Sequence, residues 1–96
     1  MDRTGVRQRS KGLLGSMYRL EVAAAIADAE GQPVHAQELA DATGLRYPRV
    51  QSELKHLLAL GMLRESECDG RAVEYKAVSS EYWNACRSLL TEWEQG

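Results

Sequence analysis

The chain has 96 residues and a formal net charge of −2, with 44% hydrophobic and 27% charged residues. This length fits one domain with a modest core, and the sequence has no run of about 18 apolar residues that would span a membrane. The N-terminus lacks an apolar signal segment, and two cysteines are too few for a secreted disulfide framework. We therefore expect a cytoplasmic protein.

Positive charge is concentrated in two parts of the sequence. Residues 1–19 hold five basic groups and one acidic group, and residues 46–64 hold four basic groups and one acidic group. Residues 20–45 carry five acidic groups and no basic group, and residues 65–96 carry seven acidic groups and three basic ones. Because local charge governs contact with a phosphate backbone, the negative total does not exclude nucleic-acid binding.

Residues 1–10 contain little apolar material, so we predict a flexible basic N-terminal arm ahead of a single domain over residues 11–96. The basic side chains of this region could reach phosphates or the minor groove of DNA, or they could belong to a solubilising tail. They are Arg3, Arg7, Arg9 and Lys11.

A helix is predicted from Leu13 to Ala29, and Gly31 and Pro33 end it. Apolar residues surround almost the whole of this helix, which must therefore be covered on more than one face. Since a domain of 96 residues offers little material for two covers, we expect a partner subunit to supply the second.

A helix-turn-helix follows. Val34 is expected to be a short extended segment, and a helix is predicted over residues 35–43. Gly44 suits the position just after that helix. Pro48 suits the first turn of the next helix, which is predicted to run to about Leu60.

Two extended runs, residues 62–68 and 72–78, flank the turn signal Asp69-Gly70 and predict a β-hairpin. A strict two-residue turn would place Glu65 opposite Glu74, an unfavourable pair of like charges. The register is therefore left open, and a longer loop is expected.

A last helix is predicted to begin after Ser79 or Ser80, either of which can cap it. Its apolar stripe is formed by Tyr82, Trp83, Cys86, Leu89, Leu90 and Trp93. The predicted order is helix, short strand, helix, turn, helix, two-stranded hairpin and helix. This mainly α arrangement with a small β-hairpin is a winged helix-turn-helix.

Several segments resemble the ArsR-type transcriptional repressors, and the resemblance extends over roughly residues 12–90. The MarR-like and PadR-like winged-helix families share most of these motifs. The matching segments are residues 18–22, 38–40, 44–45, 48–50, 54–55, 57, 61–63, 75 and 78–79.

Membership of such a family implies a homodimer that binds operator DNA and represses transcription, with subunits joined through the first and last helices. The implied interface residues are Leu14, Tyr18, Tyr82, Trp83, Leu89, Leu90 and Trp93. The chain departs from the metal-sensing ArsR pattern, because residues 37–43 contain no cysteine or histidine and the last helix contains no histidine. No metal site is therefore predicted. The wing is also acidic, which argues against its contact with DNA.

The second helix of the motif carries an apolar stripe of Val50, Leu54, Leu57 and Leu58. Its other side is polar and basic, which fits a recognition helix in the major groove, where arginine reads guanine and glutamine reads adenine. A plain solvated helix face is the alternative. The predicted DNA-binding residues are Arg46, Tyr47, Arg49, Gln51 and Ser52 for bases, and Lys55, His56 and Arg71 for phosphates.

The sequence indicates no enzyme and no cofactor, because it has no glycine-rich phosphate loop and no nucleophile motif. A redox role for Cys68 and Cys86, or an effector site near the aromatic residues of the last helix, has less support. The function predicted is a sequence-specific double-stranded DNA-binding regulator, acting as a homodimeric repressor on a palindromic operator. The alternative is a winged-helix module that binds another protein and not DNA.

Overall fold

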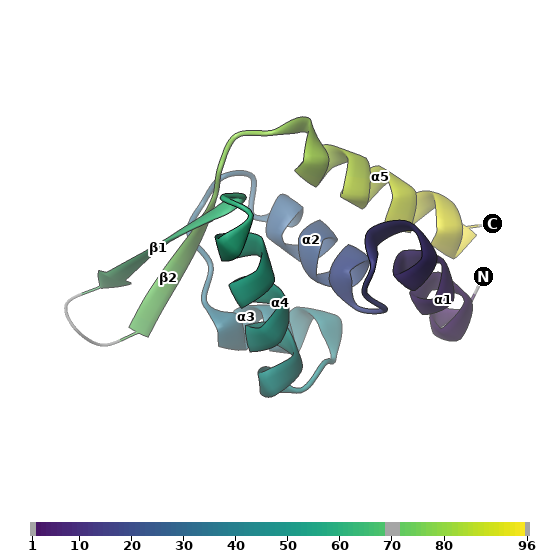
Figure 1. Ribbon diagram of the computed structural model, residues 1–96, viewed down its shortest axis with the longest axis horizontal. Coiled ribbons are helices and arrows are strands. Elements are labelled where there is room, and N and C mark those ends of the chain that lie inside the picture. Colours follow the sequence, from purple (N-terminus) through teal and green to yellow (C-terminus); the bar gives the residue numbers. More distant parts are fainter. Residues whose placement is uncertain (1, 69–71, 96) are drawn as a thin grey trace.

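The computed structural model describes residues 2–68 and 72–95 and confirms a mainly helical chain with one small antiparallel sheet, a winged helix-turn-helix (Figure 1). The elements are α1 (Arg3–Leu14), α2 (Arg19–Asp28), α3 (Ala36–Thr43), α4 (Tyr47–Ala59), β1 (Leu63–Cys68), β2 (Ala72–Ala77) and α5 (Glu81–Gln95). In the described part of the chain, no helix combines the length and apolar character needed to cross a membrane.

The prediction of a flexible arm over residues 1–10 is wrong, because α1 occupies nearly all of this segment. The Asp2 carboxylate caps the helix by accepting a hydrogen bond from the Gly5 amide at 2.9 Å. Val6 is 3% exposed and Ser10 is fully buried. The Ser10 hydroxyl donates to the Ser16 carbonyl oxygen at 2.6 Å. The helix is thus held by contacts with residues beyond the segment itself.

The single helix predicted from Leu13 to Ala29 is in fact two helices. Gly15 has a φ of +85°, a left-handed conformation that suits glycine and ends α1. The chain then turns, and α2 begins at Arg19. The Arg19 guanidinium donates to the Leu14 carbonyl oxygen at 2.6 Å, which satisfies one of the terminal acceptors of α1.

Helix α2 lies at the centre of the molecule, with α5 on one side, α3 and α4 on the other, and α1 near its N-terminal end (Figure 1). Leu20, Val22 and Ala23 on α2 are completely buried. The chain therefore covers this apolar helix by itself. The expectation that a partner subunit must supply the second cover is wrong, because α1 and α5 provide the missing material.

Helices α3 and α4 form the helix-turn-helix. Gly44, with φ +72°, sits at the turn, and its amide donates to the Ala40 carbonyl oxygen at 2.9 Å. The predicted apolar stripe of α4 is confirmed for Val50, Leu54 and Leu57, which are at most 1% exposed. This packing turns the opposite face of α4 toward solvent.

The hairpin has a register that a two-residue turn cannot give. Glu65 pairs with Tyr75, and Cys68 pairs with Ala72, so the expectation of a longer loop is confirmed. The predicted turn residues fall in segment 69–71, outside the described residues. The predicted short extended segment is an isolated bridge, in which Val34 and Tyr75 exchange two backbone hydrogen bonds of 2.8 Å.

Helix α5 begins where the serine residues predict it. The Ser80 hydroxyl oxygen accepts a hydrogen bond from the Tyr82 amide at 3.1 Å. Trp83 and Cys86 are buried against the core, and the Trp83 indole donates to the Val78 carbonyl oxygen at 2.8 Å. These contacts fix α5 along α2 (Figure 1).

Candidate nucleic-acid interface

The outer face of α4 and the residue before it gather most of the predicted DNA-binding side chains. Six of these residues are exposed, among them Tyr47 at 45%. Gln51 is partly buried. The Gln51 amide nitrogen donates to the Tyr47 hydroxyl oxygen at 2.7 Å, one helical turn away. The other exposed members are Arg46, Arg49, Ser52, Lys55 and His56.

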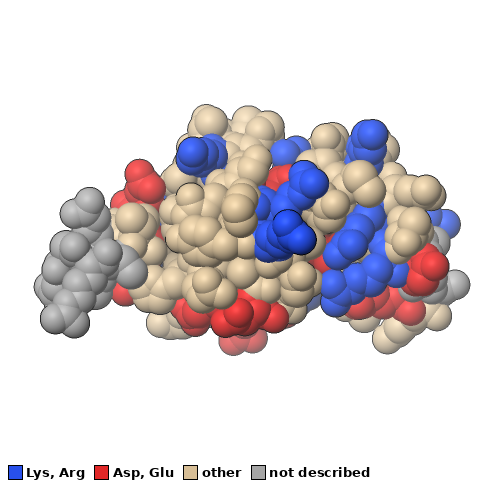
Figure 2. Space-filling view, turned by 90° about the horizontal axis from the view of Figure 1, so that it is seen from below, with Lys and Arg blue, Asp and Glu red and all other residues tan. Residues whose placement is uncertain are grey.

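Basic side chains are grouped on this side of the molecule. Figure 2 shows the surface seen from below α3 and α4, with the wing at the left and α1 at the right. Lysine and arginine side chains form a band from the middle of this view to the right, and acidic side chains gather mainly along the lower edge. The band extends from the recognition helix to α1.

Arg49 is positioned by an aromatic ring. Its guanidinium lies 4.7 Å from the centroid of the Tyr18 ring, and the Arg7 guanidinium lies 5.1 Å from the same ring. Both distances are within the range of a cation–π interaction. Tyr18 immediately precedes α2. Its ring contacts one arginine of α1 and one of α4, and so connects these two helices.

The carboxylate of Glu53, which is 7% exposed, anchors the inner side of α4. It pairs with the Arg19 guanidinium at an Nε–Oε2 distance of 3.0 Å and accepts a hydrogen bond from the Ser16 hydroxyl. The negative charge of α4 is thus paired with Arg19. Pairing of this kind is what makes a buried charge tolerable.

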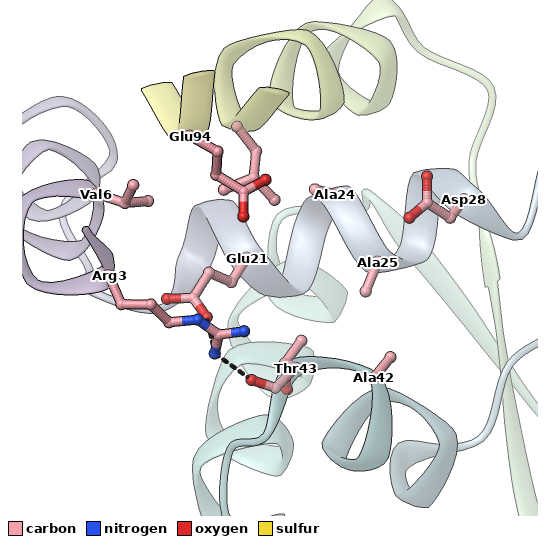
Figure 3. Close-up of a pocket in the computed structure, with 10 residues that line it drawn as sticks. Arg3, Val6, Glu21, Ala24, Ala25, Asp28, Ala42, Thr43 and Glu94 are labelled. Carbon is pink, nitrogen blue, oxygen red and sulfur yellow. Dashed lines mark hydrogen bonds and ion pairs between the residues drawn. The ribbon is translucent and has the colours of Figure 1, made fainter. Parts of the chain in front are cut away.

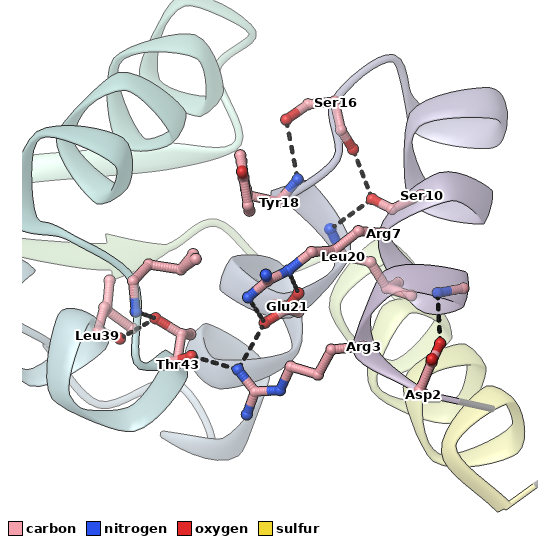
Figure 4. A network of polar contacts seen from close by, with 12 residues as sticks. Asp2, Arg3, Arg7, Ser10, Ser16, Tyr18, Leu20, Glu21, Leu39 and Thr43 are labelled. Carbon is pink, nitrogen blue, oxygen red and sulfur yellow. Dashed lines mark hydrogen bonds and ion pairs between the residues drawn. The ribbon is translucent and has the colours of Figure 1, made fainter.

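A second buried carboxylate, Glu21 on α2, binds two arginine side chains of α1 (Figure 4). Arg7 Nε lies 2.7 Å from Glu21 Oε1, and Arg3 Nη1 lies 3.3 Å from Oε2. The hydrogen bond to Glu21 raises the pKa of Arg7 above its usual value. Arg3 Nη1 also donates to the Thr43 carbonyl oxygen at 2.7 Å, which connects α1 to the end of α3.

This network borders a cavity of about 190 Å³ between α1, α2, α5 and the end of α3 (Figure 3). Arg3 and Glu21 point toward each other across its floor, and Thr43 lies beside them. Sequence reasoning missed this cluster. The signal that could have found it is a glutamate placed inside an otherwise apolar helix, because such a charge requires a partner.

The wing carries charges of both signs, since Arg64 and Lys76 are exposed on its two strands. Glu65 is exposed on β1, and Arg71 lies outside the described residues. His35, just before α3, is directed to the wing: its Nδ1 donates to the Val73 carbonyl oxygen at 3.2 Å, and its Nε2 is 3.9 Å from Glu74 Oε1. These contacts hold the wing beside α3.

The predicted interface residues do not share one surface. Trp83 is 6% exposed and belongs to the core of the single chain. Tyr18 lies between two arginines on the α4 side. Arg9 stacks 5.6 Å from the Trp93 ring, which places α1 against the C-terminal part of α5, and Leu13 on α1 is 62% exposed. The residues in partly buried positions are Leu14, Tyr18, Tyr82, Leu89, Leu90 and Trp93.

Within residues 2–68 and 72–95, no three His, Cys, Asp or Glu side chains lie close enough together to hold a metal ion. Burial raises the pKa of the Cys86 thiol, so its thiolate form is scarce at neutral pH. The chemical character of the site is therefore that of a binding surface with an exposed cationic helix.

A winged helix-turn-helix with an exposed basic helix face is an architecture found in DNA-binding transcription regulators, a class of proteins that are not enzymes. Residues 12–72 match the MarR family. The chain belongs to the MarR family. The predicted class is confirmed, whereas the ArsR name is corrected to MarR, because the motifs quoted for it are shared by both winged-helix families.

Solved structures agree with this fold. MepR, a regulator of the Staphylococcus aureus multidrug efflux pump MepA, has a TM-score of 0.72 and 15% identity, with 97% of this chain and 70% of that chain covered. A MarR-family regulator from Silicibacter pomeroyi has a TM-score of 0.69 and 18% identity, covering 94% and 60%. The AntR antimony-specific repressor has a TM-score of 0.66 and 25% identity, covering 97% and 84%. No curated protein sequence matches the chain significantly.

Proposed function

We propose that the protein is a cytoplasmic, homodimeric repressor that binds a palindromic operator in double-stranded DNA. The observation that carries this proposal is the outer face of α4, where Arg49 and Ser52 are exposed together with Arg46 just before the helix, while the opposite side of the helix is core. A helix exposed in this way can enter the major groove. A structure of a MepR mutant bound to an oligodeoxyribonucleotide has the same fold, with a TM-score of 0.64 and 16% identity.

The N-terminal part of α4 is the proposed base-reading segment. Arginine presents two donors that fit O6 and N7 of guanine, so Arg46 and Arg49 are the proposed guanine readers. Gln51 can pair with adenine once its side chain leaves the Tyr47 hydroxyl. Ser52 and Tyr47 complete the base-reading set. Phosphate contacts are proposed for Lys55, His56 and Arg71.

The subunit contact is proposed at α1 and α5, which lie side by side at the end of the molecule away from the wing (Figure 1). Leu13 is an exposed leucine on α1. Two recognition helices about 34–36 Å apart would then contact half-sites one helical turn apart. The partly buried apolar residues proposed to join the two subunits are Leu14, Tyr82, Leu89, Leu90 and Trp93.

The direct test is selection of bound duplexes from a random pool, followed by fluorescence anisotropy with the selected duplex at several salt concentrations. We expect a palindromic consensus and a steep loss of affinity with salt. Arg49→Ala should lower affinity for the selected duplex by about 5- to 150-fold and affinity for a scrambled duplex by much less. Arg87→Ala is the matched control, because Arg87 lies on α5 and pairs with Asp28 at 3.8 Å. Equal affinity of the parent protein for selected and scrambled duplexes would refute the proposal.

A second function is favoured by one feature, the acidity of the wing. The segment from β1 through β2 carries four acidic and three basic residues, and Glu65 is exposed. Such a surface suits a protein partner with a basic patch. If the protein passes through a heparin column without salt-dependent retention and elutes from cell extract with a protein partner, the interaction-module function replaces the DNA-binding one.

A further inference from the structure

Two arginine side chains from different helices meet on the one ring of Tyr18, and their surroundings differ. Arg7 on α1 is fixed by Glu21, with Arg7 Nε at 2.7 Å and Arg7 Nη2 at 3.5 Å from its carboxylate oxygens. The guanidinium of Arg49 on α4 has no hydrogen-bond or carboxylate partner among the described residues. Its contact with the ring, at 4.7 Å, is therefore the interaction that orients its guanidinium.

The backbone segment that carries the Tyr18 ring is attached to the same helix that carries Arg49. The Tyr18 amide donates to the Ser16 hydroxyl oxygen at 3.3 Å, and the Ser16 hydroxyl donates to Glu53. Glu53 lies one turn after Arg49 on α4, and Arg19 also binds it. The segment between α1 and α2 is thus attached to α4 at Glu53, which keeps the backbone that carries the ring close to the turn of α4 that carries Arg49.

Stacking and base recognition use different parts of the guanidinium group. An aromatic ring contacts the flat face of the group, whereas a guanine contacts the N–H donors at its edge. An arginine held on a ring can therefore bind a base without leaving it. Holding the long side chain in one place before binding also removes part of the entropy that binding would otherwise cost.

We propose that Tyr18 is a positioning residue for DNA recognition: it holds the Arg49 guanidinium in a fixed orientation with its donor edge free. This inference rests on the proposed function, since it requires Arg49 to read a base. It reassigns Tyr18 from the subunit contact implied by its sequence to the recognition surface. A crevice of about 200 Å³ beside α4 is lined by Tyr18, Arg49, Ser52 and Lys11, and also by Glu53, whose charge is paired with Arg19.

The experiment compares Tyr18→Leu with Tyr18→Phe in the full chain, using the selected and scrambled duplexes described above. Tyr18→Leu removes the aromatic face, and we expect a loss of about three- to tenfold in affinity for the selected duplex with little change for the scrambled one. Tyr18→Phe retains the ring and should restore the affinity of the parent protein. Affinity equal to that of the parent for both variants would overturn the inference.

A double-mutant cycle separates positioning from general stability. If Tyr18 acts through Arg49, Tyr18→Leu combined with Arg49→Ala should bind no more weakly than Arg49→Ala alone. Fully additive losses would contradict the inference. If Tyr18→Leu is unfolded at the temperature of the assay, Tyr18→Met is used as a second variant without an aromatic ring. Sedimentation should show the same subunit state for all variants, and dissociation of both Tyr18→Leu and Tyr18→Phe would assign the residue to subunit contact instead.

The proposed function and this inference fail in different ways. If the parent protein binds the selected and scrambled duplexes equally well, the proposed function is refuted. If the parent protein prefers the selected duplex, and Arg49→Ala abolishes this preference while Tyr18→Leu leaves it intact, only the role of Tyr18 is refuted.

Discussion

Helix α4 and the β1–β2 hairpin both border the proposed DNA-contacting face, but they are attached to the molecule differently. Helix α4 buries Val50, Leu54 and Leu57 in the core, and its one acidic residue is paired inside the protein. The hairpin is joined at its base, where Tyr75 bonds to the chain before α3, and it exposes Val73 and Glu65. Helix α4 is therefore packed along a whole face, whereas the hairpin enters the core at Leu63 and Tyr75 and leaves Val73 and Glu65 exposed to solvent.

The largest expected effect of this difference in packing is on the free energy of unfolding of variants in the two regions. Leu54→Ala removes a side chain that is 1% exposed, and we expect a loss of about 2–5 kcal/mol because a cavity remains under α4. The matched change on the wing is Val73→Ala, which removes a side chain that is 36% exposed and should cost less than about 1 kcal/mol. Urea denaturation followed by circular dichroism measures both. Similar losses for the two variants would mean that the wing is as deeply integrated as the helix.

Glu53 on α4 and Glu65 on the wing provide a second comparison. Glu53→Gln leaves the Arg19 guanidinium, whose side chain is 13% exposed, without its ionic partner, and we expect a loss of about 2–3 kcal/mol in unfolding free energy. Glu65→Gln changes an exposed residue and should stay within about 0.5 kcal/mol of the parent. Thermal melts of the two variants test this difference, and a stable Glu53→Gln protein would show that the pair does not anchor α4.

The smallest expected effect concerns DNA affinity. Glu65→Gln removes an exposed negative charge from the wing, so it should raise affinity for any duplex about two- to threefold at low salt and less at high salt. Glu92→Gln, which removes an exposed negative charge from α5, is the control, and sedimentation must show that its subunit state is unchanged because α5 belongs to the proposed subunit contact. Anisotropy titrations at two salt concentrations measure the change. An unchanged affinity would place the wing away from the phosphate backbone.

The order of elements and the exposed face of α4 could be predicted from the sequence because both follow from local periodicity and turn residues. The helix at the N-terminus could not, since Val6 is the only aliphatic residue in segment 2–10 and the helix depends on distant partners. Arg3 and Arg7 bind Glu21, and Ser10 accepts a hydrogen bond from Leu20. Contacts between side chains far apart in the sequence carry no periodic signal.

The same limit explains what was missed at the site. The exposed positions of Arg49 and Ser52 were predictable from a helical wheel, but the ring of Tyr18 beneath Arg49 was not, because 31 positions separate the two residues. The inference of a partner subunit from the apolar α2 failed for a related reason. The periodicity of a single helix does not show that α5 packs along α2 or that α1 folds back against its N-terminal end.

The hydrogen bond from Arg3 to the Thr43 carbonyl oxygen gives the first residues of the chain a role in orienting the helix-turn-helix. It holds the last turn of α3 in place, immediately before the bend at Gly44 that sets the direction of α4. A truncation that removes Arg3 would therefore release the end of α3 and leave Arg7 as the remaining ionic partner of Glu21.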